Sequence, residues 1–435
     1  MRKNNENRWW KGKHHVNRVQ IKTVSRLEPF IQIDLIKFRI FTSLNQTNPN
    51  NMKNLKLIGF FSLIAISGWL SACGNKASES TEQEEAVVKE QSFGNTFKGK
   101  EVQLFEIKNA KGLKMKVTNF GARVTELWVP DKNGNPVDIV LGFNTLDEYL
   151  NSSEKYIGAS IGRYGNRIAN GEFTLNDVVY KLPINNNGQT LHGGPGGFDW
   201  VVWDAQKVAD NSIEFSYKSP DGEEGFPGEL LVKMVYTLTD ENEFKVTYEA
   251  ETDQATPVNL THHSFFNLNG AGEGTILNHE LQLNASKYTP VNGVLIPTGE
   301  ILEVAGTPFD FTSSTEIGAR IENENEQLGF GGGYDHNWVL DKSSNDLTQA
   351  AVVSSPQTGI KMEVWTTEPA IQFYSGNFLD GTIHGKEGKS YDFRGAFCLE
   401  TQHYPDSPNQ PNFPSTILNP GEKYEQTCIY KFDVE

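Results

Sequence analysis

Residues 229–252, "ELLVKMVYTLTDENEFKVTYEAET", decide the fold class of this chain. In each half, apolar or aromatic residues alternate with polar ones, which is the period of a strand with one buried face. The polar segment "TDENE", residues 239–243, separates the halves and is typical of a short hairpin turn. The stretch therefore predicts two antiparallel strands joined by a tight connection.

The same pattern recurs along the chain from about residue 93 onward. Only short segments, such as residues 146–150, are candidates for helix, and no internal repeat is present. Many closely spaced strands without alternating helices predict an all-β protein, a large sandwich or barrel, in one domain spanning residues 94–435. The other predicted hairpin turns and strands are "DKNGNP" (131–136), "LND" (175–177), "SIEFSYKS" (212–219), "HELQLNA" (279–285), "AIQFYSGNFL" (370–379) and "YEQTCIYKFDV" (424–434).

Charge is distributed unevenly along the chain. The formal net charge is −16, yet residues 1–51 are basic, with ten Lys or Arg against three Asp or Glu. The acidic remainder argues against nucleic acid or an anionic membrane surface as the main partner. A neutral small molecule is compatible with this balance, because net charge does not steer it.

The N-terminal region predicts an exported protein. Residues 52–72 have a basic start, an apolar run and small residues, which is the pattern of a signal peptide. "LSAC", residues 70–73, resembles a bacterial lipoprotein box, so we expect cleavage before Cys73 and lipidation of Cys73. An uncleaved anchor helix is the alternative. The protein would then be lipid-anchored in the cell envelope, at the periplasm or outer membrane of a bacterium, and touch the membrane only through Cys73.

The segments on either side of the predicted signal peptide agree with an exported protein. A signal peptide normally begins a chain, so residues 1–51 are interpreted as an over-long gene call with Met52 as the true start. Residues 73–93 are polar, acidic and almost free of aromatic residues, as expected of a flexible tether. The simplest expectation for the assembly is a monomer. Cys398 and Cys428 could pair as a disulfide, as export favours, but we expect two free thiols.

Several motifs concentrate polar groups in strand-like or glycine-rich contexts. They contain no phosphate-loop pattern, no His-Glu-x-x-His and no Gly-x-Ser-x-Gly. Adjacent His262 and His263 on a strand would point to opposite faces, so they cannot share one metal ion, and no metal site is expected. The motifs are "IGRYGNRIANG" (161–171), "LHGGPGGFDW" (191–200), "VNLTHHSFFNL" (258–268), "GGGYDHNWVL" (331–340), "AIQFYSGNFLDG" (370–381) and "RGAFCLETQ" (394–402).

General acid–base chemistry remains as the prediction. In "RGAFCLETQ", alternation places Phe397 and Leu399 on one face and Glu400 on the other, and a carboxylate there needs a polar pocket. His263 could donate a proton and Glu400 accept one. Apolar faces were expected from Phe265, Trp338 and Phe373. The donors and acceptors for a polyhydroxylated ligand would be Asn166, Arg167, His192, Asp335 and Gln372.

These motifs, in this order, resemble the aldose 1-epimerase (galactose mutarotase) family over nearly all of residues 95–435. The resemblance implies a large β super-sandwich of the galactose mutarotase type, and cofactor-free interconversion of the α and β anomers of free hexoses such as glucose and galactose. It implies that Glu400 is the base for the C1 hydroxyl and His263 the acid for the ring oxygen, with the five polar residues above binding sugar or assisting the acid. The proline-rich loop after Glu400 would form the wall beside it.

The chain departs from the family pattern at two positions. The family commonly has Asn where His262 stands and often has Tyr where Phe265 stands, which leaves the preferred aldose open. Three alternatives are compatible with the sequence: a non-catalytic sugar-binding surface lipoprotein, a glycoside hydrolase using Asp335 and Glu400, and a mutarotase for hexose 6-phosphates. The last would need more basic residues than Arg163 and Arg167.

Overall fold

The computed structural model describes residues 91–435. The predicted extension 1–51, the signal peptide 52–72, Cys73 and most of the tether lie outside the described residues. The first strand, β1 (Gln91–Phe97), begins within the last residues of the predicted tether. No helix between residues 91 and 435 is long and apolar enough to cross a bilayer.

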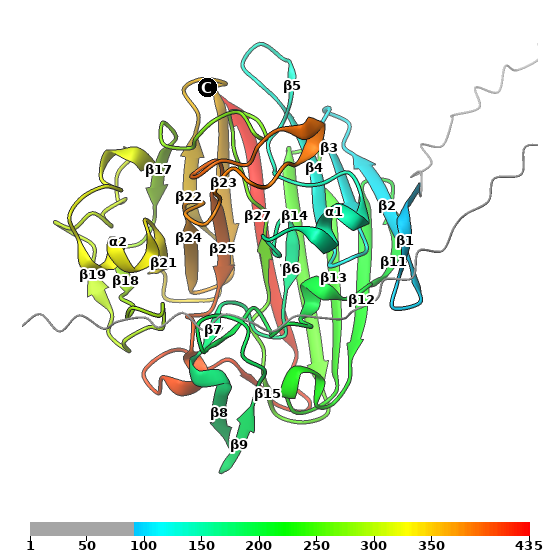
Figure 1. Ribbon diagram of the computed structural model, residues 1–435, viewed down its shortest axis with the longest axis vertical. Coiled ribbons are helices and arrows are strands. Elements are labelled where there is room, and N and C mark those ends of the chain that lie inside the picture. The colour runs from blue at the N-terminus through cyan, green and yellow to red at the C-terminus, as the bar shows by residue number, and fades with distance from the viewer. Residues whose placement is uncertain (1–90) are drawn as a thin grey trace, which may run out of the picture. The chain divides into compact units, whose positions relative to one another are not determined.

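The predicted hairpin of residues 229–252 lies near the centre of a nine-stranded sheet, and every neighbouring pair in this sheet is antiparallel. Leu238 pairs with Phe244 across the turn, so the prediction for this stretch is confirmed. Figure 1 shows the long strands of this sheet running vertically through the domain. In spatial order they are β11 (Asp204–Ala209), β12 (Ser212–Ser219), β13 (Leu230–Leu238), β14 (Glu243–Thr252), β27 (Tyr424–Val434), β23 (Ile360–Thr366), β22 (Thr348–Ser354), β17 (Glu280–Leu283) and β20 (Thr315–Glu316).

Two five-stranded sheets pack with this large sheet. The first is a meander in chain order: β1, β2 (Lys100–Lys108), β3 (Lys114–Thr118), β4 (Arg123–Pro130) and β5 (Pro136–Asp138). The second has the order β19 (Leu302–Glu303), β18 (Lys287–Thr289), β21 (Asp335–Val339), β24 (Ala370–Tyr374) and β25 (Cys398–Gln402). One apolar cluster contains residues of all three sheets, including Met115, Met234 and Phe373. The all-β sandwich is therefore confirmed.

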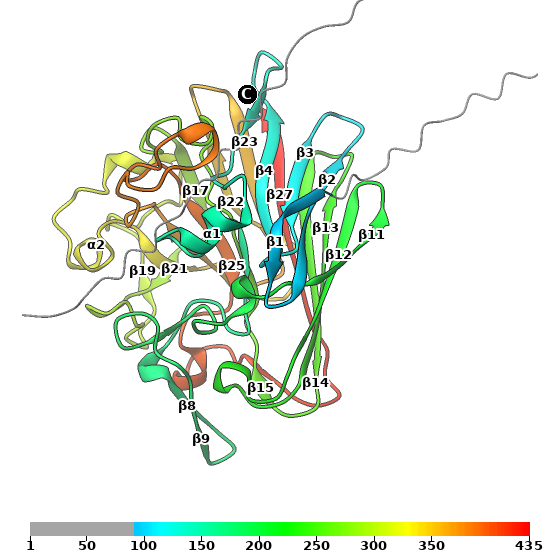
Figure 2. The same cartoon turned by 45° about the vertical axis from the view of Figure 1, so that its right-hand side comes forward.

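Short pairs of strands connect and decorate these sheets. The β8–β9 hairpin protrudes from the domain (Figures 1 and 2). The pairs are β6 (Ala159–Ile161) with β16 (Thr261–His263), β7 (Arg167–Ile168) with β10 (Thr190–Leu191), β8 (Glu172–Leu175) with β9 (Val178–Lys181), and β15 (Thr256–Pro257) with β26 (Ile417–Leu418).

Helices are short in the described part of the chain. The predicted helix is α1 (Leu146–Asn151), which begins with a reciprocal capping box between Thr145 and Glu148. A second helix, α2 (Glu326–Gly331), was not predicted. It ends among the glycines before Tyr334, and Gly332 at its C-terminus has φ +65°, a conformation that glycine adopts at little cost.

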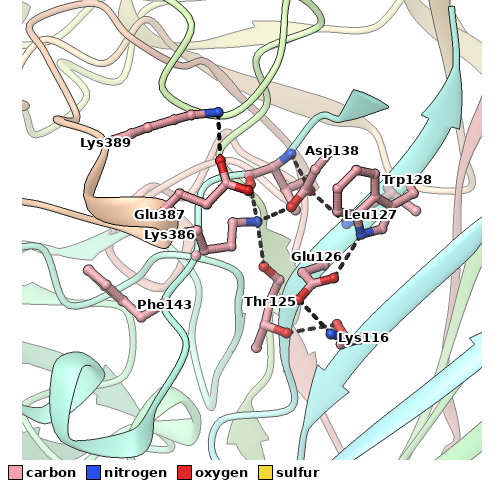
Figure 3. Close-up of polar contacts among 12 residues, drawn as sticks. Lys116, Thr125, Glu126, Leu127, Trp128, Asp138, Phe143, Lys386, Glu387 and Lys389 are labelled. Atoms are coloured by element: carbon pink, nitrogen blue, oxygen red, sulfur yellow. Dashed lines mark hydrogen bonds and ion pairs between the residues drawn. The ribbon is translucent and has the colours of Figure 1, made fainter. Parts of the chain in front are cut away.

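A buried lysine ties the loop between β24 and β25 to the first sheet. Lys386 Nζ donates to the carbonyls of Thr125 (2.7 Å) and Val140 (2.8 Å) and to the Asp138 carboxylate (Figure 3). Asp138 in turn accepts a hydrogen bond from the Leu127 N–H at 3.0 Å. Because all three ammonium donors are used, Lys386 fixes its loop to strands β4 and β5 and the residues that follow them.

Cys398 and Cys428 are both buried free thiols, as the sequence led us to expect. Cys398 belongs to β25 and Cys428 to β27, and burial raises the pKa of each thiol.

Candidate active site

A cavity of about 310 Å³ contains most of the polar residues predicted to bind substrate. Its volume is near the lower end of the range for small-molecule sites, which is roughly 300–1,000 Å³. Of the seven predicted site residues, six line this cavity: Asn166, Arg167, His192, His263, Asp335 and Glu400. The seventh, Gln372, lies beside it.

Neighbouring strands of the second five-stranded sheet supply one wall. Gln372 on β24 pairs with Glu400 on β25, and Asp335 on β21 pairs with Tyr374 on β24. Antiparallel pairing with period-two alternation places these polar side chains on one face and apolar residues such as Phe373 on the other. The sheet thus gives the carboxylates a rigid backbone mount.

His263 and Glu400, which the sequence predicts to act as acid and base, lie next to each other in this cavity. His263 Nε2 lies 3.5 Å from Glu400 Oε1, and both side chains are almost completely buried. Burial raises the pKa of Glu400 well above its usual range, and the nearby Asp335 charge raises it further. Burial also lowers the pKa of His263 to about 3. Both shifts favour the uncharged form of each group, since removing a charge from water is costly.

Asn166 and His192 flank the antiparallel pair β7–β10, and two hydrogen bonds between them fix the tautomer of His192. The Asn166 N–H donates to His192 Nδ1 at 3.1 Å, and the His192 N–H donates to the Asn166 carbonyl at 3.0 Å. Burial holds the pKa of His192 well below its usual value, so the ring is neutral. Because Nδ1 accepts a hydrogen bond, the ring proton lies on Nε2. His192 therefore presents a fixed N–H donor.

Arg167, Asp335 and Gln372 form a connected group at the same wall. Arg167 Nη1 lies 3.9 Å from Asp335 Oδ2, and Gln372 Nε2 donates to Asp335 Oδ1 at 2.8 Å. Burial raises the pKa of Asp335, while the Arg167 charge and the Gln372 hydrogen bond oppose that shift. Gln372 thus orients Asp335, which itself lines the cavity.

Two expectations about the surroundings were wrong. Trp338 and Phe373 do not face the cavity but lie in the apolar core, since they alternate with the polar residues of β21 and β24. The proline-rich loop does not line the cavity either. Instead, it holds the backbone of Arg167, because the Asp406 N–H donates to the Arg167 carbonyl at 2.8 Å. Residues 415–418 of this loop line a separate cavity of about 800 Å³, which shares no residue with the acid–base site.

Sequence reasoning missed several lining residues, and the loop before β6 supplies four of them: Ser153, Glu154, Lys155 and Tyr156. Tyr374 and Phe378 add stacked rings at 5.7 Å. Tyr374 could have been predicted, because it lies two residues after Gln372 in the same strand and its side chain therefore points to the same face. The loop has no periodicity that would have marked it.

A metal ion fits this site poorly. One donor atom from each of His192, His263 and Glu400 lies within 4.8 Å of the others, and two imidazoles with a carboxylate are ligands that zinc accepts. However, the Asn166 N–H occupies the Nδ1 lone pair of His192. The other ring nitrogen carries the proton in that tautomer, so it has no lone pair to give a metal.

A β-sandwich with a small polar cavity, a buried imidazole–carboxylate pair and several fixed donors is an arrangement that suits an enzyme acting on a small molecule. The chain belongs to the aldose 1-epimerase family of isomerases, whose family model matches residues 103–431.

Curated relatives share much of the sequence. A galactose mutarotase from Bos taurus is 47% identical over 333 residues, covering 77% of this chain and 94% of the relative. An aldose 1-epimerase from Escherichia coli (strain K12) is 37% identical over 339 residues, covering 78% and 97%. Among solved structures, an aldose epimerase homologue from C. elegans has a TM-score of 0.71 at 32% identity, covering 77% of this chain and 99% of that one. The galactose mutarotase type of sandwich is thereby confirmed.

Proposed function

We propose that this protein interconverts the α and β anomers of free hexoses such as glucose and galactose, with Glu400 as the base and His263 as the acid. The observation that carries these roles is the 3.5 Å contact of His263 Nε2 with Glu400 Oε1 in a cavity lined by polar side chains. With these two atoms so close together, one group can act on the C1 hydroxyl and the other on the ring oxygen, which are bonded to the same carbon of the sugar.

The reaction conserves protons. Glu400 takes the proton of the C1 hydroxyl, the bond between C1 and the ring oxygen breaks, and His263 gives a proton to the ring oxygen. The open-chain aldehyde rotates about the C1–C2 bond. On closure from the other face, the ring oxygen returns its proton to His263 and Glu400 returns a proton to the C1 oxygen. Acid and base catalysis of this kind each contribute about 10²–10⁴-fold.

The electrostatics of the pair suit this cycle. Burial favours a protonated Glu400 and a neutral His263, so the resting pair holds one proton. A carboxylate with an imidazolium also holds one proton. Transfer from Glu400 to His263 therefore prepares both groups without uptake from solvent, and the mutual attraction of the new charges opposes their desolvation.

The surrounding groups favour a neutral sugar as substrate. His192 offers an N–H donor, and Arg167 and Asp335 offer a donor and an acceptor for hydroxyl groups. Acidic and basic side chains both line the cavity, Glu154, Asp335 and Glu400 with Lys155 and Arg167, so it has no excess of basic groups that would select an anionic sugar.

The test is polarimetry on freshly dissolved α-D-glucose and α-D-galactose, with the Glu400→Gln variant beside the wild type. We expect faster relaxation to an unchanged final rotation, and loss of that acceleration in Glu400→Gln while the sugar still binds. Binding without acceleration by the wild type would instead indicate a sugar-binding protein. Release of reducing sugar from a glycoside would indicate a hydrolase.

We also propose that the protein works in the cell envelope as a lipoprotein. The support is the sequence alone: residues 52–72 and the Leu-Ser-Ala-Cys string ending at Cys73. Cells fed a radioactive fatty acid should label the protein in the membrane fraction, and Cys73→Ser should abolish that label. Label on the Cys73→Ser protein would contradict the proposal.

A further inference from the structure

We propose that Tyr156 and Phe265 are positioning residues for the acid, and that their aromatic faces stabilise the His263 imidazolium. This inference rests on the proposed function, in which His263 donates the proton to the ring oxygen. It assigns a task to two residues that neither touch the Glu400 carboxylate nor carry a group that titrates near neutral pH.

Ring geometry carries the inference. The imidazole of His263 is stacked with the Phe265 ring at a centroid distance of 5.0 Å and an interplanar angle of 18°. It is also stacked with the Tyr156 ring at 5.9 Å and 22°. Both distances are within the range of about 6 Å at which a cation is attracted to the face of an aromatic ring.

The backbone fixes both rings relative to His263. Strand β16 pairs with β6 so that His263 is opposite Ala159, and the Ala159 N–H donates to the Tyr156 carbonyl at 3.0 Å. On the other side, the Leu141 N–H donates to the Phe265 carbonyl at 2.8 Å. The Tyr156 hydroxyl accepts a hydrogen bond from Asn185 at 3.5 Å. The rings are therefore held in place before a sugar binds.

The acid needs such help because most of its surroundings oppose a positive charge. His263 is buried, and the buried Arg123 adds a like charge nearby. His192 meets it edge-on at 5.1 Å and is neutral. Among residues 91–435, Glu400 alone offers a carboxylate within 4 Å of the ring nitrogens of His263. Leu side chains at positions 156 and 265 would exclude water, but they have no quadrupole to attract an imidazolium.

The decisive experiment replaces Phe265 by phenylalanines with increasing fluorination. Fluorine withdraws electron density from the ring face with little change in size, so packing is kept while attraction to the cation falls. We expect kcat to fall progressively, by about 2- to 30-fold at full fluorination, with KM nearly unchanged. Polarimetric rates over a range of sugar concentration give both constants.

Position 156 provides a matched pair of variants. Tyr156→Leu should lose kcat by a similar factor, and Tyr156→Phe, which keeps the aromatic face, should retain the kcat that the leucine variant loses. Circular dichroism and Tm establish that each variant is folded. Equal kcat across the fluorinated series, or equal loss in the Phe and Leu variants, would overturn the inference. If the wild-type protein had no mutarotase activity, that result would instead contradict the proposed function itself.

Discussion

At the scale of single residues, alternation and motif density revealed six polar residues that line the cavity but not the polar residues of the loop before β6. His263, Glu400 and Asp335 were found because charged groups in strands with apolar neighbours need a polar pocket. The tautomer of His192 could not be predicted, since it depends on a hydrogen bond from Asn166, 26 residues away. The placement of Trp338 in the site was wrong because the period of a strand separates two faces without saying which one faces the pocket.

The contribution of the His192 N–H donor to substrate binding can be measured. We expect His192→Ala to lower kcat/KM by about 10- to 100-fold, because one hydrogen bond from a buried donor to the substrate is lost. His403→Gln is the matched control, because His403 pairs with Glu368 and lines the other cavity. Equal effects of the two substitutions would contradict the assignment.

Another histidine gives a pH-dependent stability. His279 is completely buried, its Nε2 accepts the Leu268 N–H at 3.0 Å, and burial lowers its pKa to about 3. The unfolded chain binds a proton at this residue below pH ~6.5 and the folded chain does not. Below that pH, wild-type stability should therefore fall relative to His279→Gln by about 1.4 kcal/mol per pH unit, and the difference should be constant above pH ~7.5.

Urea denaturation of both proteins between pH 5 and 8 would measure this difference. Taking the difference between the two proteins cancels the contributions of the other titrating groups. One of these groups is Asp199, whose pKa is raised by burial to about 7, so that its contribution to stability decreases as the pH rises. A difference that does not change with pH would contradict the prediction, because it would mean that His279 has the same pKa in the folded and unfolded states.

At the scale of elements, hairpins were predictable and long-range contacts were not. The turns at residues 131–136, 175–177 and 239–243 each join two paired strands. Helix α2 escaped prediction because it has only six residues and contains Gly329 and Gly331. The bonds of Lys386 join positions separated by 246 to 261 residues, which no local pattern can indicate.

We expect Lys386→Met to destabilise the fold by about 3–5 kcal/mol, because the Asp138 carboxylate is left buried without its partner. Urea denaturation measures the change. In Lys386→Met with Asp138→Leu, most of that loss should be recovered, since neither buried charge remains. Lys389→Met in the same loop is the control: its ion pairs are exposed, and the change should be under about 1 kcal/mol (Figure 3). Equal destabilisation by the two single variants would refute the explanation.

At the scale of the whole molecule, the sequence predicted the class of fold but not the arrangement of its sheets. Many short strands without alternating helices indicated a sandwich. The pairing of β14 with β27, which completes the centre of the nine-stranded sheet, joins residues near 247 to residues near 427. Such pairings depend on the packing of a core shared by three sheets, which no periodicity encodes.

The two buried thiols report on the integrity of that core. In a Cys73→Ser protein, neither Cys398 nor Cys428 should react with a chromogenic disulfide reagent under native conditions, because both are buried and burial raises their pKa values. Both should react in urea, with a midpoint that matches the loss of circular dichroism. Rapid reaction of either thiol in the native protein would contradict the packing of β25 and β27.

The cavity is built from two kinds of wall, and this division sets how the enzyme can diversify. The sheet carries Asp335 and Glu400, whereas Ser153, Glu154, Lys155, Asn185 and Asn186 come from connecting segments outside the strands. We expect substitutions in those segments to change which sugar is accepted while leaving strand β25, which carries Glu400, unchanged. We therefore expect a library confined to those five codons to yield new substrate ranges while keeping the proton-transfer chemistry. Natural variation at the same five positions should have the same effect.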